Sequence, residues 1–134
     1  MASRRLLTHT VELFNYIGEI DDEATYQKTI LRFCYCPSKR GVDVIGHGKV
    51  SQDEAKLYIF DVGTLAESED GHSRSYLPFH EWEVAEDKTP YWTLNGEGDD
   101  FFKVVGAPDK LKITDFSRKS TGTRRMWHFE VTAQ

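Results

Sequence analysis

The sequence predicts an all-β domain, a small β-barrel or sandwich of about six or seven short strands with long loops and at most one short helix. Three observations predict it. Stretches of alternating apolar and polar residues recur along the chain, clusters of Gly, Pro, Asn and Asp separate them, and a single stretch has helical spacing. Because 134 residues suffice for one hydrophobic core and not for two, we expect one domain over 1–134, with a flexible arm at 1–8 and a projecting loop at 63–78.

The first two predicted strands form a hairpin. Residues 10–17 alternate between apolar and polar side chains, as a half-buried strand does. The residues that share one side are Val11, Leu13 and, as a further candidate, Asn15. Residues 18–25 are acidic and predict a turn, and residues 26–35 are rich in the β-branched and aromatic residues that favour a second strand.

The middle of the chain holds two more predicted strands and the longest irregular stretch. Residues 42–50 have glycines on both sides of His47, which suggests a bulge or a close backbone approach. After a turn at 51–54, residues 55–62 form the clearest apolar strand. Residues 63–78 lack a strand pattern, and we expect them to project because loops of this length are often functional.

The one helix is predicted over residues 79–87, where the spacing places Trp82 near Phe79. The Tyr and Trp at 91–92 are expected to pack against the sheet. A cluster of Asn, Gly and Asp predicts a turn before another strand at 101–105.

The C-terminal part predicts a second hairpin with a basic tip. Residues 111–114 alternate, and residues 126–131 alternate again, with Trp127 on the same face as Phe129 and Val131. Residues 117–125 contain no apolar residue and predict a solvated loop. The four positive charges of this loop are Arg118, Lys119, Arg124 and Arg125.

Three roles are open for this basic tip. It could meet carboxylates of a partner, it could be solvated surface charge, or it could contact a phosphate backbone. The formal net charge of −5 places DNA contact behind the other two.

The charge is unevenly distributed along the chain. Residues 61–87 contain eight acidic residues and one base, whereas residues 117–125 have the opposite sign. Opposite faces of this kind allow copies to associate head to tail, although two solvated surfaces are the more frequent outcome. The contact candidates from the acidic segment are Glu67, Glu69, Asp70 and Arg74.

The cysteines and the hydropathy pattern predict a reduced, intracellular product. Cys34 and Cys36 lie two apart in a predicted strand, so both point to one side, where neighbouring thiols rarely bridge each other. The N-terminus has no apolar run behind its positive charges and so does not resemble a signal peptide. No stretch approaches the roughly 20 apolar residues of a membrane span.

No catalytic, cofactor-binding or metal-binding residue is predicted. The five histidines are scattered, and their spacing indicates no orienting partner for a general base. Cys34 and Cys36 lack the second pair of ligands that a zinc site needs. Phosphate loops and nucleophile elbows are absent from the sequence, so we expect a protein that is not an enzyme.

Short segments along most of the chain resemble one protein family. The segments are 11–16 (VELFNY), 26–31 (YQKTIL), 57–61 (LYIFD), the Gly98-Asp99 turn, 111–114 (LKIT) and 126–131 (MWHFEV). They are similar to the neck proteins of tailed phages and prophages of Gram-positive bacteria, which are head–tail connector or head-closure proteins often described as minor capsid proteins.

This resemblance implies a small β-barrel that assembles as a homo-oligomeric ring in the virion neck after synthesis in the host cytoplasm. The implied partners are portal or adaptor proteins and tail proteins, with non-specific contact to packaged double-stranded DNA as a further expectation. A tail-completion or tail-terminator role in the same particle is an alternative. The resemblance implies no cofactor and no membrane.

The main rival expectation is a monomeric β-barrel module that binds a peptide or a carbohydrate. Trp82, Tyr91 and Trp92 could form an aromatic platform for such a ligand, although aromatic residues of this kind more often pack in the core.

Overall fold

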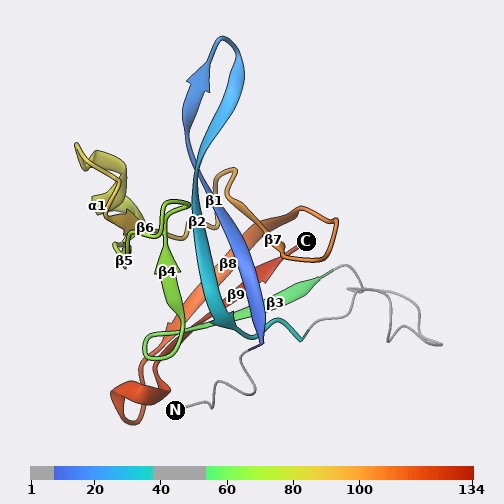
Figure 1. The fold of residues 1–134 in the computed structure, drawn as a ribbon, viewed down its shortest axis with the longest axis vertical. Coiled ribbons are helices and arrows are strands. Elements are labelled where there is room, and N and C mark those ends of the chain that lie inside the picture. Colours follow the sequence, from blue (N-terminus) through green and yellow to red (C-terminus); the bar gives the residue numbers. More distant parts are fainter. Residues whose placement is uncertain (1–7, 38–53) are drawn as a thin grey trace, which may run out of the picture.

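The computed structural model describes residues 8–37 and 54–134, and over these residues the protein is an all-β domain (Figure 1). The main sheet contains β1 (His9–Ile20), β2 (Glu23–Cys34), β3 (Ala55–Phe60), β4 (Leu65–Glu67), β7 (Phe101–Val104), β8 (Leu111–Lys119) and β9 (His128–Ala133). The smaller elements are β5 (Ser75–Tyr76), β6 (Tyr91–Trp92), the helix α1 (Phe79–Val84) and the 3-10 helix η1 (Arg124–Met126). The predicted all-β class is thus confirmed. Apart from Thr8, the arm expected at 1–8 lies outside the described residues, as do the strand expected around His47 and the turn before residue 54.

The sheet curls until its two sides meet. Its strands follow the order β3-β9-β8-β7-β1-β2-β4, and each pairs antiparallel with its neighbours. Just beyond β2, the Tyr35 amide donates to the Tyr58 carbonyl at 3.1 Å and the Tyr58 amide donates back at 2.8 Å. Since Tyr58 belongs to β3 at the far side of the sheet, this pair closes the sheet into a small barrel.

Alternate residues of the strands fill the barrel. On β1, Val11, Leu13 and Asn15 are all fully buried, as the period of two predicted. On β9, Phe129 and Val131 are buried in the same way. Each large apolar side chain that leaves water stabilises the fold by roughly 1.5–3 kcal/mol, so this alternation supplies most of the driving force for folding.

The hairpin of β1 and β2 is longer than predicted and is the part that projects. The turn predicted over 18–25 is wrong in extent, because the strands continue to Ile20 and resume at Glu23. The turn itself consists of Asp21 and Asp22, whose φ angles of 55° and 67° are those of a two-residue type I′ connection. In Figure 1 the outer half of this hairpin extends well beyond the barrel.

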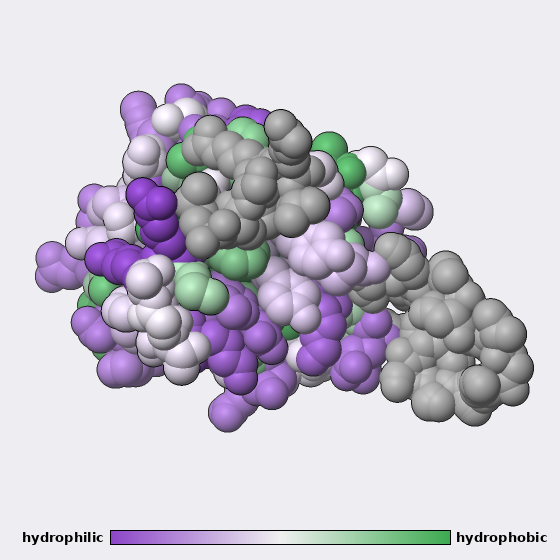
Figure 2. All heavy atoms as spheres, turned by 90° about the horizontal axis from the view of Figure 1, so that it is seen from below, coloured by the Kyte–Doolittle hydropathy of each residue, from purple (hydrophilic) through white to green (hydrophobic). Residues whose placement is uncertain are grey.

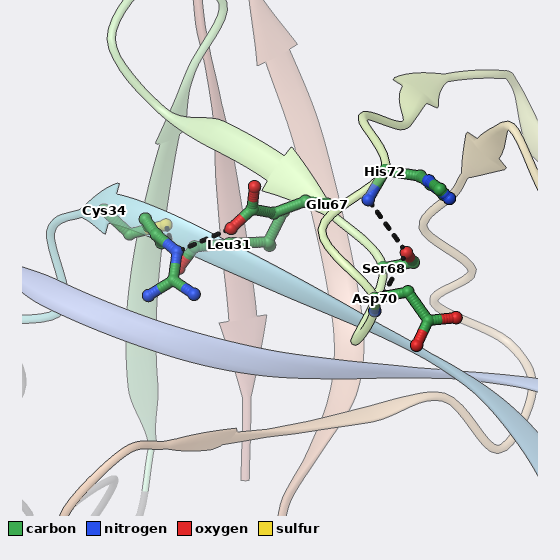
Figure 3. A network of polar contacts seen from close by, with 7 residues as sticks. Leu31, Cys34, Glu67, Ser68, Asp70 and His72 are labelled. Carbon is green, nitrogen blue, oxygen red and sulfur yellow. Dashed lines mark hydrogen bonds and ion pairs between the residues drawn. The ribbon is translucent and has the colours of Figure 1, made fainter.

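The segment expected to be an irregular, projecting loop, 63–78, instead contains β4 and β5. β4 pairs with β2 and lies along the barrel wall, where Glu67 accepts a hydrogen bond from Arg32 Nε at 2.7 Å. Figure 3 shows the turn that follows. In it Ser68 Oγ accepts hydrogen bonds from the backbone amides of Asp70 and His72, at 3.2 and 3.1 Å. The pairing of β4 with β2 holds this part against the sheet, so residues 63–78 contain two short strands where the sequence pattern predicted none.

The predicted helix is present but shorter, over Phe79–Val84. Trp82 stacks near Phe79, with ring centroids 6.2 Å apart, and is only 2% exposed. Lys88 Nζ donates to the carbonyls of Glu83 and Ala85, which lie at the C-terminal end where helical carbonyls lack partners.

The C-terminal hairpin is confirmed, with two corrections. Its second strand, predicted over 126–131, is β9 and begins at His128, because Met126 belongs to η1. β8 continues to Lys119, so residues 117–119 pair with β9 and are strand rather than loop. The continuation places Arg118 over the barrel and leaves Arg124 and Arg125 in η1 at the tip.

Candidate partner-binding pocket

A pocket of about 350 Å³ lies beside the C-terminal hairpin, between the ends of β3 and β8, the segment around β5 and β6, and η1. It combines positive charge with aromatic walls. The side chains that give it this character are Asp61, Arg74, Tyr76, Trp92, Arg118 and Arg124. Three guanidinium groups against one carboxylate leave an excess of positive charge.

Arg118 and Asp61 form the centre of the pocket. Arg118 Nη2 donates to Asp61 Oδ2, and its guanidinium lies 5.0 Å from the ring centre of Phe129 and 5.8 Å from that of Tyr76. The Asp61 side chain is 5% exposed, and its second oxygen, Oδ1, is buried without a hydrogen-bond partner among the described residues.

Arg74 forms the wall on the side of β2. It donates to the Lys28 carbonyl at 2.5 Å, to Thr29 Oγ1 at 2.9 Å and to the Thr89 carbonyl at 2.8 Å. Burial lowers the pKa of its guanidinium from the ordinary value, against the opposing effect of Glu69. These bonds tie β2 to the segment before β6, so Arg74 shapes the pocket and contributes charge to it.

Arg124 is the accessible cation of the pocket. It lies in η1 with its guanidinium 5.6 Å from the ring centre of Trp127. No acidic group in the described ranges lies within ion-pair distance of it. Its guanidinium is therefore available to a carboxylate or phosphate of a partner, which Arg binds with two parallel hydrogen bonds.

The structure brings together three of the predicted contact residues, Arg74, Arg118 and Arg124, and separates the others from them. Lys119 and Arg125 are exposed outside the pocket. The acidic candidates lie along β4 and the turn after it, where Glu67 pairs with Arg32, Glu69 lies 3.6 Å from Lys28, and Asp70 is exposed.

Sequence reasoning missed Asp61, Tyr76 and Trp92 as members of the pocket. Asp61 directly follows the apolar strand β3, and its amide donates to the Trp127 carbonyl at 3.0 Å, which draws it beside the last hairpin. A charged residue at the end of a buried strand was the one available signal. The strand order determines which other residues lie near Asp61 in the pocket. The local sequence pattern does not reveal that order.

The proposed aromatic platform is not present as a surface. Trp82 and Trp92 are 2% and 5% exposed, and Trp92 packs against Tyr76 and Phe129. The alternative expectation, that these tryptophans belong to the core, is confirmed. Trp92 contributes only an edge to the pocket.

A second polar cluster lies inside the barrel, around Asp100. Asp100 Oδ2 accepts a hydrogen bond from Asn15 Nδ2, and Asp100 Oδ1 accepts one from the Tyr16 amide, both at 2.8 Å. Asn15 also exchanges hydrogen bonds with the backbone of Thr93. Burial raises the pKa of Asp100 to about 6, although the hydrogen bonds from Tyr16, Asn15 and Asn95 act in the opposite direction. The cluster joins β1 to the segment before β7 and has a structural role.

Cys34 and Cys36 are both buried, and no disulfide joins them. Burial raises the pKa of the Cys34 thiol to about 12, which keeps it protonated and unreactive. Over residues 8–37 and 54–134, no group of three or more His, Cys, Asp or Glu side chains is placed to hold a metal ion. No helix of the described part is long and apolar enough to cross a membrane.

Fold and pocket together define a small all-β domain with an arginine-lined pocket at one end of its barrel. The chain belongs to a family of unknown function (DUF6751), whose model matches residues 6–134. Neither the curated proteins nor the solved structures contain a match to it.

Proposed function

We propose that this protein is a structural component of a virion neck. In this role it is a ring subunit that joins the portal or adaptor of the DNA-filled head to the tail and helps to retain packaged DNA. The resemblance of its short segments to phage neck proteins suggests the role. One structural observation supports it most directly, the opposite charge at the two ends of the molecule.

The two charged ends are far apart on one barrel. The outer end of the β1–β2 hairpin contains Glu19, Asp21, Asp22 and Glu23, whereas Arg118 and Arg124 lie in and beside the C-terminal hairpin at the other end (Figure 1). A rigid body with complementary charges at opposite ends associates head to tail, and such contacts form a ring when the rotation between copies closes.

The cations that would contact packaged DNA in this role lie outside the pocket. Lys119 and Arg125 are exposed and form no ion pair with any described residue. Contacts to phosphates need only charge and reach, so these two side chains would supply non-specific contacts that weaken as salt increases.

The test is the mass of the purified protein by light scattering, alone and with a candidate portal complex. A ring of defined stoichiometry on the portal is the expected result. A protein that binds neither portal nor tail components would contradict the neck role. Binding to the tail alone would instead support the tail-completion or tail-terminator alternative.

A monomeric binding module is the second candidate, and the pocket volume favours it. About 350 Å³ lies within the range of small-ligand sites, and Tyr76 and Trp92 line it. A peptide or carbohydrate in the pocket would change the fluorescence of Trp92. Titration with acidic peptides and with oligosaccharides, using the Trp92→Phe variant as control, separates this candidate from a neck subunit.

A further inference from the structure

The outer end of the β1–β2 hairpin is an acidic tip with apolar flanks. Its carboxylates belong to Glu19, Asp21, Asp22 and Glu23, all exposed, and none forms an ion pair with a described residue. Ile17 and Ile20, on the same hairpin, are 49% and 64% exposed. Exposed isoleucines beside uncompensated carboxylates on a projecting hairpin are characteristic of a surface that another molecule covers.

The turn holds its two central carboxylates in fixed positions. Asp21 and Asp22 both have φ in the left-handed region, where a two-residue turn favours Asn followed by Gly. The two aspartates therefore present paired negative charge at the narrow end of the hairpin.

The pocket has an unpaired positive charge that the carboxylates of the acidic tip complement. Arg124 is exposed and has no acidic partner within the described residues. The carboxylates of an acidic turn supply the partner that this guanidinium lacks, because Arg binds a carboxylate with two parallel hydrogen bonds.

The tip and the pocket belong to different copies. In Figure 1 the β1–β2 turn lies at one end of the molecule and the end of the C-terminal hairpin, which includes η1, lies at the other. Because Arg124 of η1 lines the pocket, one chain cannot place its own tip in its own pocket. The described surface at the pocket end is dominated by hydrophilic side chains, with small apolar areas between them (Figure 2), which suits a charged contact more than an apolar one.

We infer that the Asp21-Asp22 turn of one copy docks into the Asp61/Arg118/Arg124 pocket of the next. This contact gives the ring of the proposed function its subunit interface, and the inference rests on that function. The contact is heterologous, so each copy uses one tip and one pocket. It is salt-sensitive, because its attraction is between charges near the surface.

Two variants test the contact, one that changes the tip and one that changes the pocket. Asp21→Asn with Asp22→Asn removes the charge of the tip and keeps residues that tolerate positive φ. Arg124→Ala removes the accessible cation of the pocket. Matched controls are Glu83→Gln with Glu86→Gln, two exposed acids at the helix, and Arg125→Ala, which lies next to Arg124 outside the pocket.

Sedimentation velocity over a concentration series is the first measurement. The wild type is expected to associate at low salt and to dissociate as salt rises. Each pocket or tip variant should weaken association by about tenfold or more, while the controls match the wild type. An equimolar mixture of the tip variant and the pocket variant should form dimers and nothing larger, since one intact tip meets one intact pocket.

Disulfide trapping provides a second measurement that detects weak association. Chains with Glu23→Cys, which keep Asp21 and Asp22, mixed with chains with Thr123→Cys, which keep Arg124, should cross-link to heterodimers. Chains with Glu86→Cys in place of Glu23→Cys should not. Association that both charge variants leave unchanged, or an absence of cross-linking at every concentration, would overturn the inference.

The outcomes separate this inference from the proposed function. Copies that bind the portal as a ring but associate through another surface would reject the tip–pocket contact and retain the neck role. Copies that associate through tip and pocket but never bind portal or tail would reject the neck role and retain the contact. Salt-dependent binding of duplex DNA that Arg124→Ala abolishes would assign the pocket to phosphate instead.

Discussion

Asp100 shows how one buried carboxyl group couples stability to pH. In the folded protein its pKa is about 6, above the ordinary value of 3.8, because burial disfavours the charged form. Between these two values the folded state binds a proton that the unfolded state does not bind. The contribution of Asp100 to the free energy of unfolding is therefore largest below pH 4 and falls as pH rises to about 6.

Asp100→Asn is expected to destabilise the protein, because the new amide faces the Asn15 amide and one buried hydrogen bond is lost, at a cost of about 1–3 kcal/mol. The variant also cannot titrate at this position. The difference in unfolding free energy between wild type and variant should be greater at pH 4.5 than at pH 7.5. Urea unfolding at both pH values measures it, and a difference that is independent of pH would contradict the raised pKa.

Arg118 compensates the charge of Asp61, whose side chain is nearly buried. Removal of one partner of such a pair leaves an uncompensated carboxylate, and the half-exposed position of Arg118 reduces the cost below that of a fully buried pair. Arg118→Ala should lower the free energy of unfolding by about 1–3 kcal/mol. Lys119→Ala, at the next and exposed position, should change it by less than about 0.5 kcal/mol. Equal effects of the two substitutions would argue against the ion pair.

At the scale of single elements, the local pattern predicted the faces of the strands well and their lengths poorly. The inner face of β1 follows from alternation alone, because side chains of a strand point to opposite sides in turn. Residues 18–20 and 23–25 were predicted as turn because Gly, Asp and Glu are weak strand formers. They are strand because each pairs across the hairpin, as Glu19 does with Ala24, which is information about a partner and not about the residue itself.

The turn of this hairpin carries a cost that a substitution should remove. Asp21→Asn with Asp22→Gly introduces the residues that a type I′ turn favours and should raise the free energy of unfolding by about 1 kcal/mol. Asp70→Asn, an exposed aspartate outside the left-handed region, is the matched control and should have little effect. The urea midpoint measures the change. If the turn variant is no more stable than the wild type, the backbone of the turn is not strained.

At the scale of the whole molecule, closure of the barrel depends on few described hydrogen bonds. They are the backbone pair of Tyr35 with Tyr58 and the bond from the Thr64 hydroxyl to the Phe33 carbonyl. Elsewhere the sheet is joined by continuous ladders, as between β1 and β7. The amides of Tyr35 and Tyr58 should therefore exchange with solvent through local opening, faster than the amide of Leu13. Hydrogen exchange followed by NMR tests this, and equal protection at the three positions would indicate that the seam opens only with the entire barrel.

The pocket belongs to this scale, which is why the sequence did not predict it. Arg74 and Arg118 were each singled out for their charge, but in two separate sets. They face the same pocket because β9 lies between β3 and β8 and because Arg74 is fastened to β2. The charge of each arginine can be read from the sequence, whereas the proximity of the two arginines follows from the strand order.

The strand order also determines when each strand can pair with its partner during synthesis of the chain. β1 pairs with β7 as Val11 with Val104, and β3 pairs with β9 as Ala55 with Ala133. During synthesis the first hairpin and its pairing with β4 can form early, but β3 has no ladder partner until residues 128–133 have left the ribosome. Contacts of such high sequence separation make folding slow. A nascent or truncated chain without β9 would expose the edges of β3 and β8, and would be prone to aggregation.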